Sequence, residues 1–459
     1  MAGDITQQLA RFAATLTYDR IPGPAREHTK NLLLDAVACA LAGDRGEETH
    51  QVAAFASALA ESKESSIVGG DRLSLAGATL LNGYLITAVT LCDVHRPTLT
   101  HITPEVVPPA LAIAERDGLS GRDLLVALAA GCETATRVGL GWDFPEARKR
   151  GWHGPGIIGP FGAAAAAGRL LGFDDDTMAR AYGLAGSQAA GTFAAWGTPT
   201  VKFHQIRGAL SGLMAALLAQ QKFVATREFL TAKDGGLYNT YSNGGKPEAA
   251  VADLGQRWEL EQIALRLWPC ASGIQGFVTA MFDLVQQHRL AFDQVKKLRV
   301  FTHKTLVDMH GMFPRYNGKF EALLSTHYCA AVILHDRALT LAQFEPARYN
   351  DPKLVSFAAG QVETRVDPSL TGIQAVVEAD LADGRTVSVR CEHSKGSPEN
   401  PLARAEIEEK FRAYGTGVLP AARIEEAIAA ITKLENLKSV RGLMDTLRTG
   451  NDQRALKSA

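Results

Sequence analysis

The chain has 459 residues, of which 46% are hydrophobic and 21% are charged, and its formal net charge is -1. This composition is typical of a folded globular protein and excludes a disordered or fibrous chain. Because no run of Lys and Arg and no basic amphipathic stripe occurs, we expect neither nucleic acid nor an anionic membrane as a partner.

The beginning of the chain lacks the features of a targeting sequence. The segment MAGDITQQLARFAATL has an acidic residue where a secretory signal is basic, and no uninterrupted apolar run reaches the roughly 18 residues that span a bilayer. We therefore expect a cytoplasmic protein that does not enter the membrane.

The cysteines are scattered, with no CxxC motif and no cluster. They are Cys39, Cys92, Cys132, Cys270, Cys329 and Cys391. Structural zinc and iron–sulfur sites need three or four ligands at close spacing. We therefore expect free thiols in a reducing compartment.

In chain order, the residues up to 260 or so are predicted to be helical. The segment 25–43 spaces its apolar residues three and four apart and ends at Gly43, a helix stop signal. Similar segments rich in Ala and Gly lie at 121–141, 159–173, 174–191 and 207–223. Small residues at this density let helices approach closely, which predicts a packed helical bundle.

The pattern changes after LWPCASG at 267–273. The segment 294–304 alternates like a strand, and 374–392 contains two β-rich runs joined through Asp383-Gly384, a strong hairpin signal. A helical pattern lies between them at 321–340, and helical segments return at 402–415 and 423–447.

These elements predict a mainly α fold with two domains, since 459 residues exceed what one hydrophobic core usually serves. The larger domain is all-α and is formed by both chain ends, residues 1–268 and 397–459. The smaller α+β domain, residues 269–396, is inserted between them.

Four polar clusters could carry chemistry. The densest is CDVHRPTLTHITPE at 92–105, which brings Asp93, His95, Arg96 and His101 together among prolines. Irregular backbone would let these side chains converge on a ligand for acid/base chemistry or anion binding. The alternative is structural: Asp93 would cap a turn, and backbone carbonyls would hold both histidines.

The second cluster is RKRGWHGPGIIGPFG at 148–162, where His153 precedes a glycine-rich entrance to a small-residue helix. The glycines allow close backbone approach, and the free N–H groups of the helix start would attract a carboxylate. A helix entrance with an incidental histidine is the alternative.

The third cluster is WGTPTVKFHQIRGALSG at 196–212, which places Lys202, His204 and Arg207 at the start of a long helix. Three cationic groups so close together suit an anionic substrate, and a solvated helix end is the alternative. The fourth, FPRYNGKFEALLSTHY, contains Arg315, Tyr316 and Lys319 and is not specific by itself.

Taken together and in order, these stretches resemble the MmgE/PrpD family, which includes 2-methylcitrate dehydratases, cis-aconitate decarboxylases and iminodisuccinate epimerases. The resemblance covers nearly the whole chain. It is carried by LLLDAVACALAG, the D...H..PEVVPPALAIAE stretch, GWHGPGIIGPFGAAAAAGRLLGF, VKFHQIRGALSGLMAALLAQ, LWPCASG, GKFEALLSTHY and GSPENPLARAEIEEKF. Each motif is weak alone, but seven in the right order leave little room for chance.

The resemblance implies a large helical domain and a smaller α+β domain that covers the active site as a lid. It also implies a homodimer and cofactor-independent, metal-free chemistry on a small anionic di- or tricarboxylate. Carried over residue by residue, the catalytic positions are Asp93, His101, His153, Lys202 and Tyr316.

The chemistry of such a site follows from charge. Removing a proton next to a carboxylate builds up a second negative charge, which fixed cations and hydrogen-bond donors stabilise. Lys202, His153, Arg96 and Arg207 are of the right type, and His95 and His204 lie beside them as further substrate-binding candidates. We expect His101 to act as the base, with the Asp93 carboxylate orienting its imidazole.

Departures from the family pattern leave the reaction open. Residues common in relatives are replaced at positions that would touch substrate: Cys92, Pro97 and Ile102 stand in the first motif, and Arg266 and Cys270-Ala271 near LWPCASG. We expect a lyase of the dehydratase kind. An epimerase or a decarboxylase with the same site is the alternative.

Two alternatives belong to other classes. A noncatalytic helical binding protein would not need Asp93, His101, His153 and Lys202 together. A metal hydratase could use Asp93 and His95 as ligands, but no HExxH-type spacing supports it.

Overall fold

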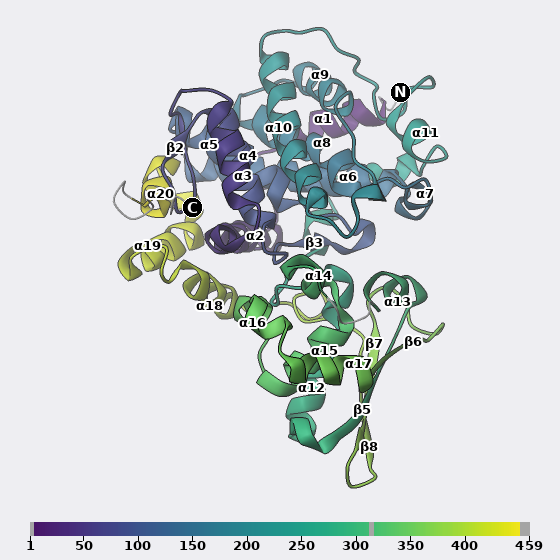
Figure 1. Ribbon diagram of the computed structural model, residues 1–459. Coiled ribbons are helices and arrows are strands. Elements are labelled where there is room, and N and C mark those ends of the chain that lie inside the picture. Colours follow the sequence, from purple (N-terminus) through teal and green to yellow (C-terminus); the bar gives the residue numbers. More distant parts are fainter. Residues whose placement is uncertain (1–3, 312–315, 450–459) are drawn as a thin grey trace. The chain divides into compact units, whose positions relative to one another are not determined.

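A computed structural model describes residues 4–311 and 316–449 of the chain (Figure 1). The fold is mainly helical, with a small mixed sheet in the C-terminal half, and at this level the predicted fold class is confirmed. The chain forms two compact units. One contains the residues up to Ala264 and those from Ala403 onward, and the other runs from Leu265 to Leu402.

The first unit is built almost entirely of helices. In its N-terminal part they are α1 (Ile5–Thr15), α2 (Gly23–Ala42), α3 (Thr49–Ala58), α4 (Leu75–Thr87), α5 (Thr103–Asp117), α6 (Gly121–Gly141), α7 (Phe144–Lys149), α8 (Gly154–Leu170), α9 (Asp175–Gly186), α10 (Thr200–Gln220) and α11 (Leu237–Tyr241). The returning chain adds α18 (Arg404–Gly415), α19 (Ala421–Thr432) and α20 (Val440–Leu447). Two small antiparallel pairs join β1 (Ser65–Ser66) to β2 (Arg72–Leu73) and β3 (Val94–His95) to β4 (Ile263–Ala264).

Helix α8 forms the centre of this unit and packs against α6, α10, α5 and α9. Its alanines Ala163–Ala167 are fully buried. Where α8 crosses α6, a Cβ atom on Gly162 would lie 2.8 Å from the carbonyl oxygen of Gly131. Only glycine allows the two backbones to come so close, so the small residues seen in the sequence do bring these helices together.

Helices from the two ends of the chain contact each other, as α18 packs on α2. At this contact the buried Lys410 ammonium lies 2.6 Å from Asp35 Oδ1 and donates to the carbonyl of Leu91. A buried cation needs such a partner. The pair ties the returning segment to the N-terminal helices.

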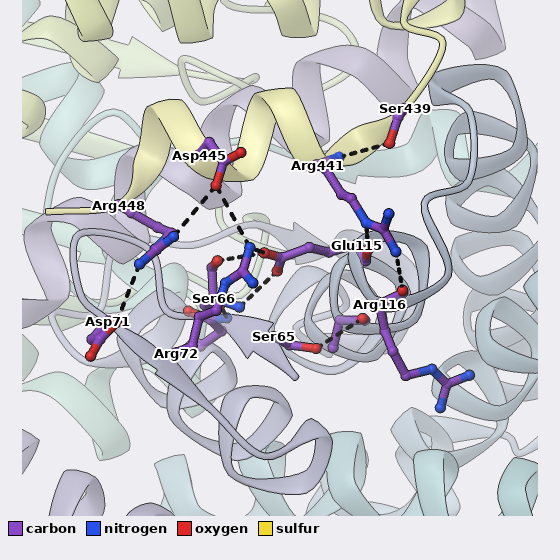
Figure 2. A network of polar contacts seen from close by, with 12 residues as sticks. Ser65, Ser66, Asp71, Arg72, Glu115, Arg116, Ser439, Arg441, Asp445 and Arg448 are labelled. Carbon is purple, nitrogen blue, oxygen red and sulfur yellow. Dashed lines mark hydrogen bonds and ion pairs between the residues drawn. The ribbon is translucent and has the colours of Figure 1, made fainter. Parts of the chain in front are cut away.

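A second polar network holds α20 against α5 and the β1–β2 pair (Figure 2). The buried Glu115 carboxylate accepts hydrogen bonds from the Ser66 amide at 2.7 Å and the Ser66 hydroxyl at 2.5 Å, and from Arg72 at 3.2 Å. From α20, Arg441 donates to the carbonyls of Glu115 and Arg116. These bonds satisfy carbonyls at the end of α5 that have no partner within the helix.

Helix α6 is long and apolar enough to cross a membrane by length and composition. Glu133 and Arg137 interrupt its apolar residues, so the helix is not a continuous apolar run. In the structure, 94% of an 18-residue stretch of this helix is buried inside the protein, as in a core helix.

The second unit combines helices with a four-stranded mixed sheet. Its helices are α12 (Gln275–His288), α13 (Lys304–His310), α14 (Lys319–Leu324), α15 (Thr326–Asp336), α16 (Pro346–Tyr349) and α17 (Pro352–Gly360). Its strands are β5 (Val295–Thr302), β6 (Val362–Val366), β7 (Ala375–Leu381) and β8 (Thr386–Cys391). The strand order is β6-β5-β7-β8, with β5 parallel to β6 and antiparallel to β7.

The predicted hairpin is confirmed. Strands β7 and β8 pair antiparallel across a turn in which Gly384 has φ +88°, a conformation that favours glycine. Buried residues alternate along β7, and α12 packs on β7 and β8. The sheet therefore buries one face beneath a helix.

The prediction of free thiols is also confirmed, since all six cysteines are free and buried.

Candidate active site

The first cluster lies at the start of α5, which begins at Thr103. The Asp93 carboxylate is fully buried and accepts hydrogen bonds from the amides of Ile102 at 2.9 Å and Thr103 at 3.1 Å, and from the Thr103 hydroxyl. It therefore occupies the place of a helix cap. Burial raises the pKa of Asp93 to about 6, although the bonds from Thr103 and Ile102 oppose the shift.

Helix α5 contains three prolines, of which Pro104 belongs to the stretch 92–105 that was expected to be irregular. Pro104 lies in its first turn, where an amide has no partner within the helix, and Pro108 and Pro109 lie inside it. The irregular part is therefore shorter than expected. It consists of β3, the 3-10 turn Arg96–Thr98 and Leu99, whose φ is +48°.

His101 is held by the backbone of Asp93. Its Nδ1 lies 2.6 Å from the Asp93 carbonyl oxygen. Because a carbonyl only accepts, Nδ1 carries the proton in this contact. The expectation that the Asp93 carboxylate orients this imidazole is wrong: the carboxylate binds the start of α5, and the carbonyl orients the ring.

His95 has two side-chain partners in the buried interior. Its Nδ1 lies 2.7 Å from the Thr98 hydroxyl, and its Nε2 lies 3.1 Å from Glu259 Oε1. Burial lowers its pKa. Both ring nitrogens hold the fold in this structure, so the predicted substrate contact of His95 would require one of these bonds to break. Arg96 begins the 3-10 turn that follows.

His153 and His204 form a pair between the starts of two helices. His153 is the residue before α8, and His204 lies in the first turns of α10. Their Nδ1 atoms are 2.9 Å apart, so one ring donates and the other accepts. The two predicted clusters that contained them therefore meet.

The electrostatics of this pair favour neutral rings. Burial, together with repulsion from His204, His101 and Arg148, lowers the pKa of His153 to about 3. Burial and the charge of Arg207 lower the pKa of His204. The first cluster lies beside the second, since a Cβ atom on Gly154, which follows His153, would lie 2.4 Å from the hydroxyl oxygen of Thr100, which precedes His101. An entering anion would raise these pKa values and favour proton uptake by the pair.

Lys202 lies in the first turn of α10 and is paired with Glu48, a residue that the sequence reasoning missed. Its Nζ is 2.9 Å from Glu48 Oε2, which also accepts a hydrogen bond from the hydroxyl of Tyr84 at 2.7 Å. Glu48 lies directly before α3 and far from Lys202 in the chain. No local sequence signal links the two residues, so only the fold reveals this partner.

Arg207 has a structural role that was not expected. Its guanidinium donates to the carbonyls of Gln188, Gly156 and Ala190, and to the hydroxyl of Ser211. It thereby joins the start of α8 to the segment after α9, whose Gly191 carbonyl accepts from the His153 amide. Arg207 supports the histidine pair, and its predicted contact with substrate would compete with these bonds.

The remaining predicted residues lie in the α+β unit. Arg266 is buried and donates to the carbonyl of Cys270 at 2.9 Å, and the Tyr316 hydroxyl lies 2.9 Å from Ser325 Oγ. Burial raises the pKa of Tyr316, so its phenol stays protonated. Arg315 lies outside the described residues. Lys319 forms an ion pair with Glu345 at 3.0 Å.

Across residues 4–311 and 316–449, no three His, Cys, Asp or Glu side chains gather in a way that could hold a metal ion. Asp93 and His95, the ligands of the metal-hydratase alternative, are committed instead to Thr103 and Glu259, respectively.

Comparison with known proteins gives matches over nearly the whole chain. The model of the MmgE/PrpD N-terminal domain matches residues 7–250, and that of the MmgE/PrpD C-terminal domain matches residues 268–436. The cis-aconitate decarboxylase-like protein oryM of Aspergillus oryzae is 29% identical, with 96% of this chain and 97% of the relative covered. The cis-aconitate decarboxylases of Aspergillus terreus and Homo sapiens are 26% and 27% identical, covering 96% and 98% of this chain and 96% and 95% of theirs.

Proposed function

Because the chain belongs to the MmgE/PrpD family, we propose that it is a lyase that releases carbon dioxide from a small tricarboxylate of the cis-aconitate type. Among the curated relatives, proteins from two fungi and from human carry the name cis-aconitate decarboxylase or a like name. They favour decarboxylation over the dehydration that the sequence analysis put first.

The observation that carries the proposal is the meeting of the His153–His204 pair with the His101 segment at the starts of α5, α8 and α10, where a Cβ atom on Gly154 would lie 2.4 Å from the Thr100 hydroxyl oxygen. Lys202 enters from the first turn of α10. Helix N-terminal ends favour anions, because their amides are unpaired and their dipoles are positive. Imidazoles and an ammonium group at such ends suit a substrate with several carboxylates.

Decarboxylation of cis-aconitate needs charge stabilisation and one proton. Carbon dioxide leaves from the CH2–COO⁻ group, and the electron pair of the broken C–C bond forms a new C=C bond. The electrons of the original double bond move to its CH carbon, which carries a carboxylate of its own. That carbon takes a proton and becomes a CH2 group. The products are carbon dioxide and a dicarboxylate with a terminal methylene group.

The residues of the helical unit match these needs. Negative charge gathers on the carboxylate next to the carbon that is protonated, where Lys202 and a protonated histidine would stabilise it. When its ring is protonated on both nitrogens, His101 can keep Nδ1 bound to the carbonyl and deliver the second proton from Nε2. In this reaction His101 acts as the acid rather than as the base, and Tyr316 stays a predicted second acid.

The experiment that tests this proposal is proton NMR in deuterated water with cis-aconitate, citrate, methylcitrate, tartrate and iminodisuccinate. We expect cis-aconitate to give a product with two vinylidene protons and deuterium at the neighbouring CH2. Hydration or dehydration products would support the dehydratase alternative, and exchange without loss of carbon would support an epimerase. No turnover of any member would overturn the proposal.

The homodimer is proposed on separate grounds. Phe203, Met214 and Leu218 are 47%, 46% and 38% exposed and lie on one face of α10, three turns and then one turn apart. An apolar face of this kind is typical of a surface that a second copy covers. Light scattering on Met214→Glu/Leu218→Glu should show monomers where the unmodified chain shows dimers.

The lid role of the α+β unit, cofactor-independent chemistry and a cytoplasmic location also stay proposals, supported by family membership. Small-angle scattering with and without a tricarboxylate would test the lid, because closure shortens the maximum dimension. Turnover that survives exhaustive chelation would test the independence from metal.

A further inference from the structure

Glu105 is a buried acid that the proposed mechanism does not use. It lies in the first turn of α5 and is 0% exposed. A Cβ atom on Gly159 of α8 would lie 2.0 Å from its carboxyl carbon, and one on Gly208 of α10 would lie 3.2 Å from its Oε1. The side chain therefore fills space that glycines leave open between the three helices whose starts carry His101, His153 and Lys202.

Neither carboxyl oxygen of Glu105 has a hydrogen-bond partner among the described protein groups. An ionised carboxylate without donors is costly in a buried position, so the neutral acid is the stable form. Burial and the charge of Asp93 raise its pKa, while Arg207 lowers it. These are the charged groups that act on Glu105. Toward it, α8 presents Gly159, and the Arg207 guanidinium is engaged by carbonyls and Ser211.

Asp93 is the opposite case. It is just as buried, but two amides and a hydroxyl donate to its carboxylate at the start of α5. Donors to the charged form favour ionisation. Where two neighbouring acids lie in such different surroundings, one ionises and the other keeps its proton.

We propose that Glu105 is a positioning residue that keeps the proton of the Asp93–Glu105 pair, so that Asp93 stays ionised and holds the start of α5 and the His101 segment in place. This inference rests on the proposed function of the same site. With only one negative charge on the Asp93–Glu105 pair, the starts of α5, α8 and α10 also continue to attract a polyanionic substrate. Ionisation of Glu105 would add a second negative charge there and weaken binding.

The first test needs no turnover. In the unfolded chain Glu105 ionises above its ordinary pKa, whereas the folded chain keeps the proton, so the stability of the unmodified chain falls as pH rises through this window. Glu105→Gln removes this linkage. The ratio of its folding constant to that of the unmodified chain should rise about tenfold per pH unit above pH 5 until Glu105 ionises in the folded state.

The second test measures the binding of propane-1,2,3-tricarboxylate, a saturated analogue, by calorimetry from pH 6 to pH 9. In the unmodified chain the affinity should fall at alkaline pH, and Glu105→Gln should move this fall to higher pH. Glu105→Leu, which is neutral and apolar, serves as a second variant. If turnover is found, the alkaline limb of kcat/KM should move in the same way.

Glu115→Gln is the matched control, because Glu115 is a buried acid of the same helix with a full set of donors. In Glu115→Gln the tricarboxylate affinity should fall at the same alkaline pH as in the unmodified chain. The inference is overturned if the ratio of folding constants does not change with pH. It is also overturned if the tricarboxylate affinity falls at the same alkaline pH in Glu105→Gln and in the unmodified chain. Absence of turnover with the tricarboxylates counts only against the proposed function, since both tests above proceed without it.

Discussion

The two ends of helix α5 differ in how their buried glutamates are hydrogen-bonded. At the C-terminal end, Glu115 receives three hydrogen bonds from Ser66 and Arg72, and Arg441 binds the last carbonyls (Figure 2). At the N-terminal end, Glu105 is buried without a partner among the described groups, and burial raises the pKa of Asp93.

This difference separates structural charges from functional ones. Buried groups whose bonds are complete stabilise the fold and rarely react, whereas groups with perturbed pKa values gather where chemistry takes place. The neutral His153–His204 pair belongs to the second kind. The comparison predicts that substitutions at the C-terminal end will change stability alone, whereas those at the N-terminal end will change turnover or its pH dependence.

The largest effect is expected for His101→Ala at the N-terminal end. If Nε2 delivers the proton, its loss should lower kcat by about 10²–10⁴-fold, the usual contribution of a positioned acid or base. The melting temperature should change little. His28→Ala is a control, because the Nε2 of His28 lies 2.9 Å from the carbonyl of Ile263 in a comparable bond. Equal losses of turnover in the two variants would contradict the role of His101.

At the C-terminal end, Glu115→Gln should act on stability. The amide keeps one acceptor but turns an NH2 group toward the donors of Ser66 and Arg72, so the free energy of unfolding should fall by about 2 kcal/mol. Urea denaturation measures this loss. Turnover per folded molecule should stay unchanged, and a parallel fall in kcat would show that this end also serves the site.

Much of the fold could be predicted because its signals are local. The predicted helix 121–141 coincides with α6, and Asp383-Gly384 does form the turn between β7 and β8. The start of α5 was missed because residues 103–105 were assigned to the irregular stretch 92–105. Tertiary packing overrides helix propensity here, since Pro108 and Pro109 lie inside a largely buried helix.

The residue types of the candidate site can be taken from the sequence, but the partners of those residues cannot. The pairing of Lys202 with Glu48 and of His153 with His204 depends on which helices meet, and chain spacing does not encode that. Glu105 gave no signal either, since a glutamate in the first turn of a helix is ordinary. Only its burial sets it apart.

The comparison can be sharpened with pH. As pH falls through about 6, Asp93 takes up a proton and can no longer accept all of its bonds from Ile102 and Thr103. The kcat/KM should therefore fall up to tenfold per pH unit below this value. His153, with its pKa near 3, stays neutral in this range.

Asp93→Asn should remove this acid limb, at the cost of lower turnover at neutral pH. The effect on stability has the opposite sign. Because the folded pKa of Asp93 is raised, its stabilising contribution is lost as pH rises through about 6. Kinetics and urea denaturation of Asp93→Asn and the unmodified chain between pH 5 and pH 8 would show both trends, and an unchanged acid limb would contradict the assignment.

The smallest effect is expected for Arg441→Ala. This variant tests whether the contacts of Arg441 at the C-terminal end of α5 influence the candidate site at the other end of the helix. Arg441 binds the carbonyls of Glu115 and Arg116 from an exposed position, so its loss should lower the free energy of unfolding by only about 0.5–1 kcal/mol. Since Asp93 fixes the opposite end of the helix by three bonds of its own, kcat and the acid limb should not move. Thermal melts and a pH profile of kcat/KM measure both quantities. A shifted acid limb in Arg441→Ala would mean that α5 transmits strain along its whole length, and the division between a structural and a functional end would fail.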